Sequence, residues 1–148
     1  MTQAQYVLNL KQSLETLREG TAWLKRSYEK CRRIGVKSAY TAEEFDIYET
    51  LSGRFARVSD ILIQKVFRSI DKVEFEEKGT MIDVINRAHK RGLISSVEEI
   101  RVMRELRNSI AHEYMTKGLP ELFEETLRYT PALFKIIDEV NNYSSRYT

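Results

Sequence analysis

Apolar residues recur every three or four positions through most of this chain, the spacing that places side chains on one face of an α-helix. One series runs from about residue 3 to 33, a second from about 42 to 70, and a third follows Pro120. The chain contains only six glycines and two prolines, which argues against a loop-rich β fold. The positions predicted to face inward in these three helices are Tyr6, Leu10, Leu14, Leu17, Thr21, Leu24, Tyr28 and Cys31, then Phe45, Tyr48, Leu51, Phe55, Val58, Leu62 and Val66, then Leu122, Leu127, Leu133, Phe134, Ile137 and Val140.

Capping sequences set the boundaries of the helices. Residues 41–44 and 96–99 have the form of capping boxes, in which a Ser or Thr is followed three positions later by Glu. Thr80 caps a short helix that Gly92 ends, and Lys117-Gly118 separates the last two helices. The sequence therefore predicts an all-α fold, an up-and-down four-helix-type bundle with a short additional helix.

The size and composition of the chain predict a soluble protein with one domain, residues 1–148. No apolar run approaches the roughly 20 residues that a membrane span needs, and the beginning of the sequence lacks a signal-peptide pattern. The single Cys31 excludes an intramolecular disulfide and fits a reducing compartment, so we expect a cytoplasmic protein with a structural thiol. A formal net charge of +2 does not by itself indicate a nucleic-acid binder.

The end of the fourth predicted helix, residues 107–114, carries an unusual set of polar side chains. At about 100° per residue, Arg107 falls inside the apolar arc, between Met103 and Tyr114. A guanidinium stays charged, so it must meet a carboxylate, a second subunit or a ligand phosphate there. Asn108 and His112 are four residues apart on the neighbouring arc, which also carries Arg104. An arginine can hold a phosphate bidentately and a histidine can move protons, so the set suits phosphate chemistry. The simpler alternative is that His112 and Tyr114 lie at the C-terminal end of the helix and have no catalytic role.

At these residues the chain resembles the HEPN domains of prokaryotic toxin–antitoxin pairs. Arg107-Asn108-x3-His112-x-Tyr114 matches the extended motif of the HepT-like toxins, and residues 53–60 and 81–94 are similar to two other helices of the family. The resemblance implies the HEPN fold and a metal-independent endoribonuclease. In that reaction a ribose 2′-hydroxyl attacks the adjacent phosphate, with His112 as general acid or base, Arg107 stabilising the charge and Asn108 orienting either His112 or the phosphate.

The resemblance also implies partners. In HepT-like toxins the tyrosine at the position of Tyr114 accepts adenylyl groups from a cognate minimal nucleotidyltransferase antitoxin, with ATP as the donor; the alternative is that Tyr114 only packs. A non-catalytic HEPN partner or substrate-binding module of a nucleotidyltransferase is the alternative function. The third possibility is a purely structural helical protein in which the motif occurs by chance.

The family forms homodimers in which the motif helices line a shared cleft. Gly53 and Ala56 are small residues in mid-helix that let another helix come close, and Arg57 and Asp60 share their face. We expect this face to help build the dimer, with Asp60 as the ion partner of an arginine; an internal bundle contact is the alternative. Arg104, Arg57 and Asp60 are thus supporting candidates for the RNA or dimer cleft.

Six cations occur among residues 25–37 (Lys25, Arg26, Lys30, Arg32, Arg33 and Lys37). A solvated helix end accounts for such a cluster, and an RNA-phosphate patch is the alternative. His89 and His112 lie far apart in the sequence, and no carboxylates accompany them at ligand spacing, so we expect neither a metal nor a cofactor.

Overall fold

The computed structural model describes residues 1–112 and 118–148, and within these ranges all regular structure is helical. The elements are α1 (Gln3–Ile34), α2 (Ala42–Asp60), the π-helical segment η1 (Ile61–Val66), α3 (Phe67–Val73), α4 (Met81–Lys90), α5 (Val97–His112) and α6 (Leu119–Ser144). Because α2, η1 and α3 follow one another without a break, they form one long helix that ends at Val73, slightly beyond the predicted end near Ile70. The prediction of an all-α chain is confirmed.

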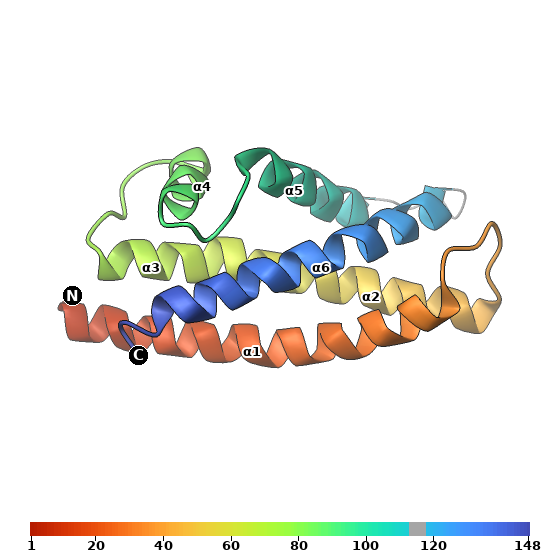
Figure 1. Cartoon of the computed structure of the whole chain (residues 1–148), viewed down its shortest axis with the longest axis horizontal. Coiled ribbons are helices and arrows are strands. Elements are labelled where there is room, and N and C mark those ends of the chain that lie inside the picture. The colour runs from red at the N-terminus through yellow and green to blue at the C-terminus, as the bar shows by residue number, and fades with distance from the viewer. Residues whose placement is uncertain (113–117) are drawn as a thin grey trace.

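The long helices run in alternating directions along the molecule (Figure 1). α1 packs along the helix formed by α2, η1 and α3, and α6 crosses both. The short α4 and then α5 lie over the face of α3 and α2 that is turned away from α1. No described helix is both long and apolar enough to cross a membrane.

The predicted capping sequences form as expected. The Thr41 hydroxyl accepts from the Glu44 N–H at 3.2 Å while Glu44 accepts from the Thr41 N–H at 3.0 Å. Thr80 and Asp83 form the same reciprocal pair at the start of α4. At the other end of α4, Gly92 has a φ of 79°, a left-handed conformation that glycine adopts without steric cost. Local chemistry therefore fixes where these helices start and stop.

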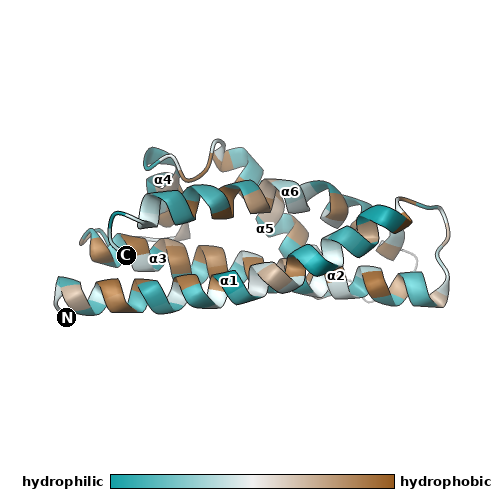
Figure 2. Ribbon diagram, turned by 60° about the horizontal axis from the view of Figure 1, so that its bottom comes forward, coloured by the Kyte–Doolittle hydropathy of each residue, from teal (hydrophilic) through white to brown (hydrophobic). Residues whose placement is uncertain are grey.

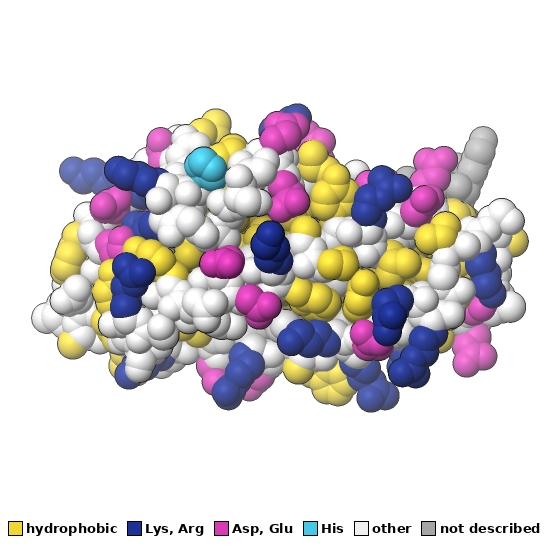
Figure 3. Space-filling view, in the orientation of Figure 1, with side chains coloured by type: hydrophobic (Ala, Val, Ile, Leu, Met, Phe, Trp, Pro, Cys, Tyr) yellow, Lys and Arg dark blue, Asp and Glu magenta, His cyan; other side chains and the backbone are white. Residues whose placement is uncertain are grey.

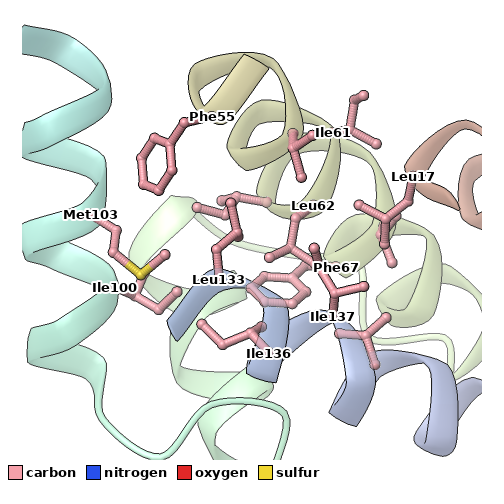
Figure 4. Packing of buried hydrophobic residues seen from close by; sticks show 14 of the residues in the cluster. Leu17, Phe55, Ile61, Leu62, Phe67, Ile100, Met103, Leu133, Ile136 and Ile137 are labelled. Carbon is pink, nitrogen blue, oxygen red and sulfur yellow. The ribbon is translucent and has the colours of Figure 1, made fainter. Parts of the chain in front are cut away.

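The core lies where the faces of α1, α2, α5 and α6 meet. Figure 4 shows Ile100 and Met103 of α5 pointing toward Phe55 of α2 and Leu133 of α6. All four side chains are at most 1% exposed. Figure 2 shows apolar and polar residues alternating along the helices. The predicted inward positions of the long helices are buried or pack against this core.

A buried ionic cluster joins α3, α4 and the end of α6. Asp71 is 1% exposed and accepts hydrogen bonds from Arg87, at 2.9 Å, and from Arg91. Arg91 also donates from Nε to Glu74 at 3.0 Å. Asp71 thereby binds two successive turns of α4 to α3 across their interface, because Arg87 and Arg91 are four residues apart.

Glu74 extends the cluster to the last residues of the chain. Its carboxylate accepts hydrogen bonds from the Tyr147 hydroxyl, at 2.7 Å, and from the Tyr143 hydroxyl. Burial disfavours the ionised carboxylate, but the hydrogen bonds from Tyr143, Tyr147 and Arg91 outweigh it and lower the pKa of Glu74. The C-terminal turn of the chain is therefore held to α3 through a charged acceptor.

The phenol of Tyr147 should make stability fall at alkaline pH. Burial, together with the hydrogen bond to Glu74, raises its pKa to about 12 from the ordinary value of 10.0. The stabilisation is complete below pH 10 and is lost as the pH rises through about 12, because the unfolded phenol loses its proton first. We expect the free energy of unfolding to fall less steeply over this window in Tyr147→Phe. Urea titrations at several pH values measure how the free energy of unfolding changes with pH in the parent and in the variant. Equal slopes in the two proteins would refute the raised pKa of Tyr147.

Candidate functional site

α5 presents the polar residues of the motif at the surface while its opposite side is buried in the core. The Ser96 hydroxyl accepts from the Glu99 N–H at 3.1 Å, which starts the helix at the predicted place. Ile100, Met103 and Leu106 are buried, and Asn108 and His112 are exposed. α5 is thus fixed by its apolar stripe, and the motif residues extend from its outer side.

Arg107 and Asp60 form a bidentate ion pair between α5 and α2. Arg107 donates from Nε to Asp60 Oδ1 at 2.8 Å and from Nη2 to Oδ2 at 2.7 Å. The side chains are 33% and 43% exposed, so the guanidinium lies at the edge of the apolar arc rather than inside it. Of the three partners that the sequence allowed, a carboxylate of the same chain is the one found. The hydrogen bonds to Asp60 raise the pKa of Arg107, which keeps it cationic.

The helix changes its geometry immediately after Asp60. The π-helical segment η1 begins at Ile61, and the N–H of Phe67 bonds to the carbonyl of Leu62, five residues earlier. Single-turn π-helical segments are rare and occur frequently at functional sites. Ile61, Leu62, Ile63 and Val66 of this segment are all buried, and the segment directly follows Asp60, whose carboxylate holds Arg107.

Arg104, Asn108 and His112 lie one turn apart along the outer side of α5. Their spacing of four puts adjacent Cβ atoms about 5–6 Å apart. Arg104 is partly exposed and has no ion-pair partner among the described residues. Arg107 is three residues from Arg104 and borders this row. The structure therefore places a cation, an amide and an imidazole in one line beside the Arg107–Asp60 pair.

The outer face of α2 is open. A Cβ built on Gly53 meets no heavy atom of the described residues within 4 Å, and Ala56 is only partly buried. Arg57 is exposed, and no described carboxylate pairs with it. At Gly53 the described residues make no internal bundle contact, whereas Asp60 on the same face makes one with Arg107. Whether a second copy covers this face stays a prediction.

Two other predictions have different outcomes. Tyr114 lies outside the described residues, so its expected role stays a prediction. Cys31 is fully buried, and burial raises the pKa of its thiol to about 12. A thiol that is hardly ever a thiolate reacts slowly, and this fits the structural role expected from the sequence.

The main surface depressions formed by the described residues are not lined by Arg107, Asn108 or His112. One of about 340 Å³, between α5 and α6, is lined by Glu105, Glu121 and Glu125 together with Ser109 and apolar side chains. An acidic rim of this kind does not suit an anionic ligand. On the face shown in Figure 3, basic and acidic side chains are intermingled. In the described ranges, no group of three or more His, Cys, Asp or Glu side chains is arranged to hold a metal ion.

The sequence contained no local signal for the pairing of Arg107 with Asp60, because 47 residues separate them. It did identify both residues, and it predicted that Asp60 would be the ion partner of an arginine. It missed the buried Asp71 cluster, for which the only signal was two arginines, Arg87 and Arg91, four apart on the short helix. No protein-family model, curated relative or solved structure matches the chain, so the case for this site comes from its own residues and their geometry.

Proposed function

We propose that this chain is a HEPN-type ribonuclease toxin of a prokaryotic toxin–antitoxin pair, a metal-independent endoribonuclease that acts in the cytoplasm. One observation carries the proposal: a partly exposed Arg107, oriented by Asp60, close in sequence to Asn108 and His112 at the end of α5. A docking surface or a structural helix would not need this combination of a phosphate-binding fork and a proton-transfer group.

The ion pair leaves Arg107 able to bind a phosphate. A guanidinium has five N–H donors, of which Asp60 takes one from Nε and one from Nη2. No other described group accepts from this guanidinium, so one N–H of Nη1 and the second N–H of Nη2, which form the terminal edge of the fork, are left for a phosphate. Asp60 holds that edge in one orientation, which lowers the entropy lost when a phosphate binds. This geometry supports a role for Arg107 at the transition state.

The proposed chemistry is the reaction that the resemblance to HEPN ribonucleases implies. A general base removes the proton from a ribose 2′-hydroxyl, whose oxygen attacks the adjacent phosphorus. The bond from phosphorus to the 5′-oxygen breaks, and that oxygen takes a proton. His112 is the acid or base in this sequence, Arg107 stabilises the charge on the phosphorane, and Asn108 orients His112 or the phosphate. The products are a cyclic phosphate end and a 5′-hydroxyl end.

The partners belong to the same proposal. A cognate minimal nucleotidyltransferase would transfer AMP from ATP to Tyr114, two residues from His112, and the added charge and bulk would repel and block an RNA phosphate. A homodimer seated on the open face around Gly53 and Ala56 would bring two copies of the motif together. Arg57 and Arg104 would add positive potential to the resulting cleft.

The direct test is cleavage of RNA by the purified protein in excess EDTA. We expect cuts that leave cyclic-phosphate ends and no cuts in the same RNA with 2′-O-methyl riboses, because the nucleophile is then absent. If RNA stays intact under all conditions, the alternative of a non-catalytic HEPN partner of a nucleotidyltransferase replaces the ribonuclease.

Arg107→Ala should lower the cleavage rate by about 100-fold, as removal of one charge-stabilising donor group typically does. Its effect on the free energy of unfolding should stay within about 1 kcal/mol, because the pair with Asp60 lies at the surface with both side chains partly exposed. Arg101→Ala is the matched control, since Arg101 is an exposed arginine of α5 that pairs with Glu98 and Glu105. Equal cleavage by the Arg101 and Arg107 variants would remove Arg107 from the reaction.

A further inference from the structure

The chain's single tryptophan lies on the surface. Trp23 of α1 is 56% exposed. The guanidinium carbon of Arg54, from α2, lies 5.0 Å from the centroid of its ring. Arg54 also donates to the Trp23 carbonyl at 3.1 Å and to the Ser27 hydroxyl at 2.7 Å. An indole stacked beside a guanidinium and left open to solvent is a platform on which a nucleic-acid base can stack.

The surroundings of Trp23 are positively charged. Arg26 and Lys30 follow it by three and seven residues, so they lie on the same side of α1, and both are exposed. No described carboxylate pairs with Arg26, Lys30 or Arg54. Glu19, one turn before Trp23, is the acidic neighbour on this side of α1. The net charge around the ring therefore favours a polyanion.

A continuous row of side chains connects this platform to the candidate active site. On α2, Arg54, Arg57 and Asp60 follow one another at intervals of three residues, which makes each a surface neighbour of the next. Asp60 then holds Arg107 on α5. From Trp23 to Arg107 the row crosses the outer face of α2 and is about 20 Å long.

We propose that this row is a binding path for single-stranded RNA, in which a base stacks on Trp23 while Arg54 and Arg57 contact the backbone leading to Arg107. The proposal rests on the ribonuclease function proposed above and adds its substrate class. A base can reach the indole only when it is unpaired, so a duplex would bind without stacking. Gly53 and Ala56 share this face of α2, so in the proposed homodimer the path enters the cleft between the two copies.

Trp23 reports on its own occupancy, because no other tryptophan contributes to the fluorescence. The probe is a single-stranded RNA of about 12 nucleotides with 2′-O-methyl riboses, which resists the proposed cleavage. We expect this probe to quench the fluorescence at low salt and its duplex form to leave the emission unchanged. Equal quenching by both forms, or by neither, would overturn the path.

Variants separate the path from a purely structural contact between α1 and α2. Trp23→Leu and Arg57→Gln should each weaken binding of a labelled probe by about 10-fold in fluorescence anisotropy, and Trp23→Phe should restore most of the loss from Trp23→Leu. Lys135→Gln, an exposed cation on α6, is the control. Trp23 and Arg57 variants that bind like the control would contradict the proposal.

The two proposals fail in different ways. If the parent protein cleaves RNA but the probe does not quench Trp23 fluorescence, the ribonuclease proposal is supported and the binding path is refuted. If the single-stranded probe quenches Trp23 fluorescence but no RNA is cleaved, the binding path is supported and the ribonuclease proposal is refuted.

Discussion

His112→Ala is expected to slow metal-independent RNA cleavage by about 10²- to 10⁴-fold, the usual contribution of a general acid or base. The fold should survive, because His112 is exposed at the end of α5. A time course with a defined RNA in EDTA measures the rate. Circular dichroism and urea denaturation confirm that the variant is folded.

The matched control is Ser109→Ala, which changes an exposed polar residue of the same helix three positions earlier. It should cleave like the parent. If His112→Ala keeps at least a third of the parent rate, His112 is not the proton-transfer group. If both variants lose activity together, the helix end is needed for its structure and not for proton transfer.

Asp71→Ala is expected to cost about 3–5 kcal/mol of unfolding free energy, the range observed when one partner of a buried ion pair is removed. The Asp71 side chain is 2% exposed and binds Arg87 and Arg91, and the Arg91 side chain is only 8% exposed. Removing the carboxylate leaves the Arg91 guanidinium buried with Glu74 as its remaining close partner. The buried guanidinium has lost its hydration, and its remaining hydrogen bonds do not replace it fully. This loss is the reason for the expected decrease in unfolding free energy.

Urea denaturation followed by circular dichroism measures the effect. Asp138→Ala, on the exposed side of α6, is the control and should shift the free energy by less than about 0.5 kcal/mol. A loss below about 1 kcal/mol for Asp71→Ala would mean that Arg87 and Arg91 reach water once Asp71 is gone. In that case the apolar face of α4 alone would hold this helix against the bundle.

The helices themselves could be predicted from sequence because their causes are local. Thr41 with Glu44, and Thr80 with Asp83, satisfy free backbone groups within four residues. The recurrence of apolar residues defines the inward face of each helix, and the buried side chains follow it closely. The π-helical segment at Ile61 could not be foreseen, since nothing in its composition differs from that of an ordinary helix.

For the candidate site, the sequence by itself determined which residues α5 brings to one side: Arg107 and, one turn apart, Arg104, Asn108 and His112. Helical spacing alone is enough for that. Only the tertiary structure decided that Arg107 meets Asp60, that no described residue covers Gly53 and that Trp23 stacks beside Arg54. These contacts join different helices, and their geometry depends on how the helices pack, which no local pattern encodes.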